Sequence, residues 1–198
     1  MSSLRQLILA NNNFVGQIPG SVENLIQLQV LNIASNTFRG RIPDSITSLK
    51  KLSRLDLSFN FFGGPIPDNI GDLIDLRELL IGTNYDDSDK SFGFDGTIPL
   101  SIGSMNKLER LELNRNRISG VLPSHHGLMN SIQVYDVSGN KRLGGTIPEY
   151  FIDMAQLNEL KFFDTDMEGG IPVSLCGMGV AIEVDCGKIK CSCCKCNV

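Results

Sequence analysis

Apolar residues recur along this chain in a fixed nine-position frame, L-x-x-L-x-L-x-x-N. The frame starts seven times, at Leu4, Leu28, Leu52, Leu76, Leu108, Ile132 and Leu157. Successive starts are 24 residues apart, except for one step of 32 and one of 25. In-phase copies of this length predict a repeat protein, in which each copy folds as one coil and stacks on the next.

The L-x-L part of each frame alternates apolar and polar positions, which predicts a short strand with its leucines on one face. One such strand cannot bury its leucines alone, whereas stacked copies form a parallel sheet on the concave side of a horseshoe. The ninth position predicts a ladder of buried asparagines whose amides satisfy backbone groups at the turn. These residues are Asn12, Asn36, Asn60, Asn84, Asn116 and Asn140. Thr165 replaces asparagine in the last copy, and its single hydroxyl predicts a weaker rung.

A second motif, G-x-I-P or a close variant, follows each of these positions. Seven of the eight prolines end this motif, from Pro19 to Pro172. Glycine permits a tight bend, and proline cannot donate to a strand ladder. Apolar residues three and six positions after the proline, such as Ile46 and Leu49, predict a short 3₁₀ turn. We therefore expect an α/β solenoid of about seven repeats, with a parallel concave sheet and a convex side of 3₁₀ turns and loops.

The frame and the G-x-I-P motif together resemble the plant-type leucine-rich repeat over residues 4–175. This resemblance implies a leucine-rich-repeat horseshoe similar to the ectodomains of receptor-like kinases and receptor-like proteins. The repeat pattern is also similar to that of secreted inhibitors of cell-wall-degrading enzymes. The resemblance implies that a protein, peptide or glycan ligand binds on the concave or lateral face. We expect a solenoid over residues 1–175 and a cysteine-rich cap over residues 176–198.

The x positions of the strands face the concave surface and predict where a ligand binds. In the third to fifth repeats these positions combine charged and apolar side chains. Since arginine and aromatic residues are frequent interface anchors, we hypothesise a mixed-charge recognition patch. The alternative is a solvated face whose opposite charges pair across strands and contribute little. The patch consists of Arg54, Asp56, Phe59, Glu78, Leu80, Arg110, Glu112 and Arg115.

Two local departures interrupt the repeat. The 32-residue step contains an acidic insertion at residues 85–93, with Asp86, Asp87 and Asp89. Calcium-loop spacing fails there, because no glycine or glutamate falls at the required positions counted from Asp87. We expect a solvated loop or a partner contact rather than a metal site. In the His125-His126 pair, His126 stands where other copies have Val, Ile or Phe, which predicts a local loss of packing; pH sensing is the alternative.

The cysteines all lie in the tail, at Cys176, Cys186, Cys191, Cys193, Cys194 and Cys196. Six cysteines allow many pairings, and zinc binding or free thiols are alternatives to disulfides. A cysteine pair that closes the final coil resembles the C-terminal cap of extracellular leucine-rich repeats, and on that resemblance we favour Cys176–Cys186. The tail also resembles those of diatom leucine-rich-repeat proteins. The alternation of Val180, Ile182 and Val184 predicts one last strand over the core.

Composition and the remaining motifs limit the function. A net charge of −4 excludes a nucleic-acid binder that works through bulk positive charge. The sequence contains no catalytic constellation, phosphate loop or kinase signature, so we expect no enzyme activity, no cofactor and no membrane span in this chain. Disulfides imply an oxidising compartment, hence an extracellular or cell-surface location.

The start of the chain adds one expectation about the whole protein. A complete repeat begins at Leu4 without a signal peptide, a capping helix or a cysteine pair before it. We expect the C-terminal part of a longer receptor-like ectodomain in signal perception, whose full-length form could carry a membrane anchor. The alternative is a secreted inhibitor or a wall-associated structural or adhesion protein.

Overall fold

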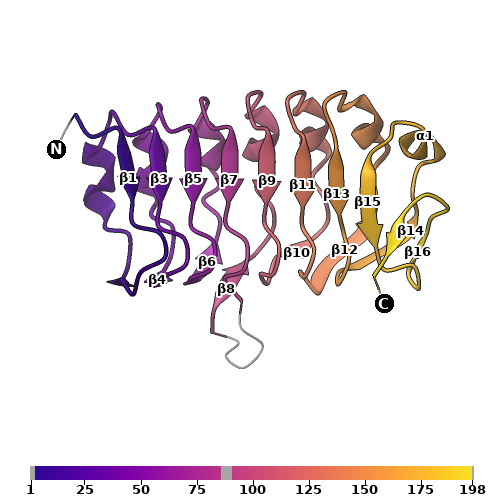
Figure 1. The fold of residues 1–198 in the computed structure, drawn as a ribbon, viewed down its shortest axis with the longest axis horizontal. Helices are drawn as coiled ribbons and strands as arrows, with labels where there is room; N and C mark the ends of the chain where they lie inside the picture. Colours follow the sequence, from indigo (N-terminus) through magenta and orange to yellow (C-terminus); the bar gives the residue numbers. More distant parts are fainter. Residues whose placement is uncertain (1–2, 86–90, 198) are drawn as a thin grey trace.

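The chain forms an elongated solenoid of parallel strands (Figure 1). The computed structural model describes residues 3–85 and 91–197, without the side chain of His125. The concave strands of this described part form one parallel sheet in chain order, with the two termini at opposite ends of the solenoid. The predicted leucine-rich-repeat horseshoe is therefore confirmed. Its concave strands are β1 Gln6–Ile8, β3 Val30–Asn32, β5 Arg54–Asp56, β7 Glu78–Leu80, β9 Arg110–Glu112, β11 Val134–Asp136, β13 Glu159–Lys161, β15 Ala181–Val184 and β17 Lys195–Cys196.

A second row of strands lies where each coil turns away from the concave sheet. The first parallel group contains β2 Val15–Gly16, β4 Thr37–Gly40, β6 Phe61–Pro65 and β8 Gly93–Asp95. The second contains β10 Ser119–Gly120, β12 Arg142–Thr146, β14 Asp166–Gly170 and β16 Ile189–Lys190. The motif glycines adopt positive φ, from 75° at Gly96 to 102° at Gly16. Glycine adopts this backbone conformation without a steric penalty, which explains its recurrence at the corner.

Short helices form the opposite side, as the apolar spacing after each proline predicts. The 3₁₀ helices are η1 Gly20–Asn24, η2 Asp44–Ser48, η3 Ile70–Asp72, η4 Leu100–Ser104, η5 Ser124–Leu128 and η6 Glu149–Asp153, and α1 spans Val173–Cys176. Their apolar side chains point into the core, where Ile46 and Leu49 are fully buried. Among the described residues, no helix has the length and hydrophobicity that crossing a bilayer requires.

The frame asparagines occupy one position in successive coils, and each connects its own coil to a neighbour. Asn60 Nδ2 donates to the carbonyl of Ile33 in the preceding coil (3.0 Å) and to Leu57 in its own (3.3 Å). Its Oδ1 accepts from the backbone N–H of Phe38 (3.0 Å). The amide therefore provides hydrogen-bond partners for backbone groups of two successive coils. Asn36, Asn84, Asn116 and Asn140 make the equivalent bonds.

The two ends of this row are different. Asn12 is exposed and donates only to the nearby carbonyls of Leu9 and Ala10, both at 3.0 Å, in the bonds that the structure shows. Thr165 Oγ1 donates to the Phe162 carbonyl (2.6 Å) and accepts a longer bond from Met167 N–H (3.4 Å). A hydroxyl has one proton where an amide has two, so this rung joins fewer backbone groups.

The tail continues the solenoid instead of leaving it. Strand β15 pairs with β13, and β17 pairs with β15. Ile182 and Val184 of β15 are buried, as is Val180 just before it, which confirms the predicted strand over the core; β17 follows it as the end strand of the sheet.

The cysteine pairing differs from the prediction. All six cysteines lie within the described residues and form Cys176–Cys193, Cys186–Cys196 and Cys191–Cys194. The favoured Cys176–Cys186 pair is wrong, because β17 returns beside β15 and brings Cys196 into register with Val184, next to Cys186. The free-thiol alternative is also wrong, because every cysteine is part of a disulfide. The zinc alternative is wrong for this disulfide-bonded form, since metal binding requires thiolates and these sulfurs are bonded to one another.

The prediction of poor packing at His126 is wrong as well. The imidazole is fully buried, and its Nδ1 lies 2.8 Å from the hydroxyl of Tyr135. Tyr135 is equally buried at a leucine position of the frame, and burial raises the pKa of its phenol well above the ordinary value. Two departures from the repeat thus compensate each other inside one coil. The side chain of His125 lies outside the described residues, and pH sensing stays a prediction.

We expect the replacements His126→Leu and Tyr135→Phe to be non-additive. Either single change removes a hydrogen bond from a buried polar partner and costs about 1–3 kcal/mol of unfolding free energy. The double variant removes both polar groups, so its cost should be smaller than the sum by roughly 1 kcal/mol or more. Urea unfolding of the four proteins measures this coupling, and strictly additive costs would contradict it.

Candidate functional site

Six of the predicted binding residues lie on three neighbouring strands of the concave sheet. Arg54, Glu78 and Arg110 are register partners in β5, β7 and β9. The adjacent column contains Asp56, Leu80 and Glu112. In a parallel sheet without register shifts, equal positions in the frame become neighbours, which is why spacing alone predicted these columns.

The charges in these columns pair with one another. The Arg54 guanidinium donates to Asp56 (3.0 Å) and bonds Glu78 (2.8 Å). Arg110 pairs with Glu112 in the same way. The side chains of Arg54, Glu78 and Arg110 remain 28–44% exposed, so these ion pairs contribute little stability. The pairing agrees with the alternative of a solvated face, while it also fixes the orientation of both guanidinium groups.

Two of the predicted residues are not accessible to a ligand. Asp56 is only 5% exposed, because it also accepts from the hydroxyl (2.7 Å) and backbone N–H (3.3 Å) of Ser58. Leu80 is 8% exposed between charged neighbours. These residues support the surface from below, and a ligand would contact the side chains around them.

Phe59 and Arg115 occupy a special backbone position just before the ladder residue. Phe59 has φ 54° and Arg115 has φ 51°. The left-handed conformation costs a residue with a Cβ roughly 1–2 kcal/mol, and asparagine and glycine tolerate it best. At Phe59 this position holds a large aromatic residue that is 59% exposed. The equivalent positions are held by Asn11, Ser35, Thr83, Gly139 and Asp164.

A basic cluster beside Arg115 was not found from the sequence. Arg115, Lys141, Asp164 and Tyr85 line a small surface pocket of about 170 Å³. A neighbouring pocket of about 180 Å³ shares Tyr85 and Lys141. Its further lining residues include Asn116, Arg117 and Arg142. The sequence did contain a signal for this cluster, because basic residues stand next to Asn116 and Asn140, which are equivalent positions of consecutive coils. These residues are Arg115, Arg117, Lys141 and Arg142.

The described end of the insertion contacts the same side of the molecule. Phe92 packs against Phe61, with ring centroids 5.1 Å apart. The Arg39 guanidinium lies over both rings, 5.2 Å from the Phe92 centroid and 5.7 Å from that of Phe61. Asp86, Asp87 and Asp89, which carry the predicted acidic character of the loop, lie outside the described residues.

Toward the C-terminus the column of Asp56, Leu80 and Glu112 continues with Asp136, Lys161 and Glu183. Burial raises the pKa of Asp136, although hydrogen bonds from Ser138 oppose this shift. Burial tends to lower the pKa of Lys161, but the hydrogen bond and charge of Glu159 outweigh it and raise the pKa overall. Lys161 therefore stays positive between acidic neighbours. The described part of the concave face thus presents charges that are largely paired with one another.

Repeated coils with buried leucines, a shared asparagine position and a polar concave sheet define a leucine-rich-repeat solenoid. Family models described as leucine-rich repeat match residues 2–62 and 107–129. The chain belongs to the plant-type leucine-rich-repeat family. None of the curated protein sequences matches it.

Solved structures with the same fold include plant receptor ectodomains. The chain is similar to the leucine-rich-repeat ectodomain of the Arabidopsis thaliana membrane receptor kinase GASSHO1/SCHENGEN3, in complex with CASPARIAN STRIP INTEGRITY FACTOR 2. The identity is 31%, the TM-score is 0.81, and the match covers 91% of this chain and 21% of the ectodomain. This chain therefore spans about a fifth of the length of that ectodomain chain.

Two further structures are similar over a larger part of their own length. A chain of the Arabidopsis thaliana BIR3–SERK2 complex is 31% identical, with TM-score 0.61 and coverage of 72% of this chain and 71% of that one. A plant ice-binding protein is 27% identical, with TM-score 0.77 and coverage of 89% and 57%.

Proposed function

We propose that this chain recognises a protein or peptide ligand on its concave face, as part of an extracellular receptor-like ectodomain. The proposed contact residues are Arg54, Phe59, Glu78, Arg110, Glu112 and Arg115, with Asp56 and Leu80 supporting them. Phe59 is the observation that carries the proposal, because an exposed aromatic ring at a left-handed backbone position has a cost and no burial to offset it.

The neighbouring charges suit a polypeptide. A guanidinium has five N–H donors, so Arg54 and Arg110 can hold a ligand carboxylate or backbone carbonyl while keeping contact with Glu78 and Glu112. A ligand of mixed charge matches such a surface better than one of a single sign. The aromatic ring of Phe59 adds apolar contact area beside the charges.

The similar solved structures support a protein or peptide as the ligand, and the disulfides support an extracellular location. GASSHO1/SCHENGEN3 is a receptor kinase whose ectodomain was solved with a bound factor, and BIR3–SERK2 is a complex of two proteins. The disulfides of the tail are typical of an oxidising, extracellular environment.

The proposal predicts that patch variants lose ligand affinity without losing the fold. A phage-displayed random peptide library, panned on the wild-type chain, supplies the probe. Phe59→Asn should weaken an enriched peptide by about tenfold or more, as should the charge-neutral double change Arg110→Ala with Glu112→Ala. Phe59→Asn should also raise the free energy of unfolding by roughly 1 kcal/mol, since asparagine tolerates positive φ. Calorimetry and urea unfolding measure the two effects.

Ser35→Asn is the matched control. It makes the same kind of change at φ 54°, one coil outside the patch, and should leave peptide affinity unchanged. Enriched peptides that bind both patch variants as tightly as the wild type would refute this location of the site.

A further inference from the structure

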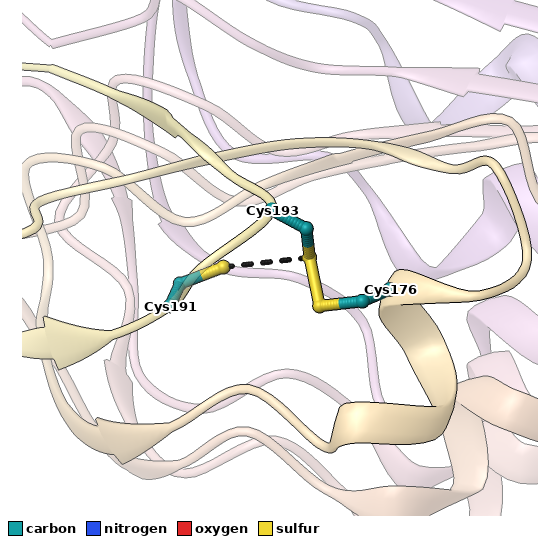
Figure 2. A group of neighbouring side chains, drawn as sticks. All are labelled: Cys176, Cys191 and Cys193. Carbon is teal, nitrogen blue, oxygen red and sulfur yellow. Dashed lines mark hydrogen bonds between the residues drawn. A yellow bond between two sulfur atoms is a disulfide. The ribbon is translucent and has the colours of Figure 1, made fainter.

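Three of the tail sulfurs lie together although only two of them are bonded to each other. Cys176 and Cys193 form a disulfide, and Cys191 Sγ is 3.6 Å from Cys193 Sγ (Figure 2). The sulfurs of Cys176, Cys191 and Cys193 all lie within 4.8 Å of one another. All three take part in disulfides and carry no thiol proton, so the 3.6 Å approach is a packing contact between two disulfides.

The second disulfide in this contact, Cys191–Cys194, closes the shortest loop of the three disulfides. Cys191–Cys194 joins residues three apart, whereas the other two links span 10 and 17 residues. A link that closes a shorter loop removes less entropy from the open chain and therefore stabilises the protein least. Its C-x-x-C spacing also favours reversible thiol chemistry, and both cysteines are partly exposed.

We infer that Cys176, Cys191 and Cys193 form a thiol–disulfide exchange site that is opened by a small dithiol. One dithiol sulfur attacks Cys194 Sγ, breaks the Cys191–Cys194 bond and releases the Cys191 thiolate. The second dithiol sulfur then displaces Cys194 as a thiol. The reagent becomes a cyclic disulfide and has given two electrons to the protein.

Once released from Cys194, the Cys191 thiolate turns about its side-chain bonds and attacks Cys176 Sγ from the side opposite Cys193, because displacement at sulfur proceeds in line with the bond that breaks. A Cys176–Cys191 bond forms, the Cys176–Cys193 bond breaks, and Cys193 leaves as a thiolate that takes up a proton. The covalent connection from α1 to the tail therefore moves by two residues and is not lost. Cys186–Cys196 lies outside this group of sulfurs and keeps β17 tied to the sheet throughout. The outer loop of the cap is switchable, while the strand that covers the last coil stays fixed.

The replacement Cys194→Ser tests the exchange without any reductant, because it leaves Cys191 as a free thiol. We expect two disulfide isomers, Cys176–Cys193 and Cys176–Cys191, after folding. Rapid acid quenching and N-ethylmaleimide should then label both Cys193 and Cys191 in the population. Trypsin cuts after Lys190 and Lys195, so fragmentation of one short peptide assigns the label.

Cys191→Ser is the matched control. It frees Cys194, which is not in the group of close sulfurs, so the label should stay on Cys194 and Cys176–Cys193 should persist. Partial reduction of the wild-type chain with dithiothreitol gives an independent reading that does not depend on folding of a variant. There we expect a Cys176–Cys191 cross-link with label on Cys193 and Cys194. Label confined to Cys191 in the Cys194→Ser protein, or no Cys176–Cys191 cross-link in the reduced wild type, would overturn the proposal.

Discussion

Replacing Asn140 by alanine is expected to lower the free energy of unfolding by about 3–5 kcal/mol, since each buried group left without a partner costs about 1–3 kcal/mol. The side chain is fully buried and donates to the carbonyls of Leu113 (3.0 Å) and Val137 (2.8 Å). Its Oδ1 accepts from the backbone N–H of Ile118 (3.0 Å). Alanine can serve none of these groups, and water does not reach them.

The control for this prediction is Asn12→Ala at the first rung. Asn12 is exposed, and its two bonds go to nearby carbonyls that water can solvate. We expect a loss of less than about 1 kcal/mol there. Urea unfolding followed by circular dichroism measures both variants, and equal losses at the two positions would show that the interior ladder has no special role.

The second large effect is expected for Gly71→Ala, which should cost about 3 kcal/mol or more through overpacking. A Cβ on Gly71 would lie 2.1 Å from the backbone oxygen of Ser101 and 2.6 Å from its carbonyl carbon. Backbone atoms cannot rotate away, so η3 and η4 would have to separate. That separation would also weaken the bond from Gly71 N–H to Ser101 Oγ (3.1 Å).

Gly20→Ala provides the comparison within the first helix of the same side. No atom lies within 4 Å of a Cβ placed there, so we expect a change of at most about 0.5 kcal/mol. Thermal unfolding of the two variants separates close packing between coils from a general effect of glycine removal. A Gly71→Ala protein as stable as the wild type would mean that neighbouring coils shift apart without cost.

The recurring positions of the fold were predictable because the repeat imposes the same environment on each copy. Leu55 is buried, as its place in the frame predicts, and Pro43 precedes a 3₁₀ helix, as its motif predicts. The neighbours Arg54, Glu78 and Arg110 follow for the same reason. In a parallel sheet whose coils have nearly constant length, the residue number alone gives the column.

The accessibility of the candidate patch was not predictable in this way. Leu80 and Glu112 share one outward column, yet Leu80 is nearly buried and the side chain of Glu112 is 28% exposed. Side-chain length and pairing with neighbours decide exposure, and these depend on which residues meet across strands. The basic cluster likewise forms only because side chains of consecutive coils lie next to one another. Its members are Arg115, Arg117, Lys141 and Arg142.

By itself, the sequence determined the solenoid, its strand register, the asparagine positions and the columns of the concave face, because a periodic pattern specifies structure wherever the period holds. Only the tertiary structure decided the contacts between residues that depart from the pattern. His126 meets Tyr135 in the core, and Cys176 meets Cys193 where the tail folds back. These pairings depend on the path of the chain in space, which no repeated spacing specifies.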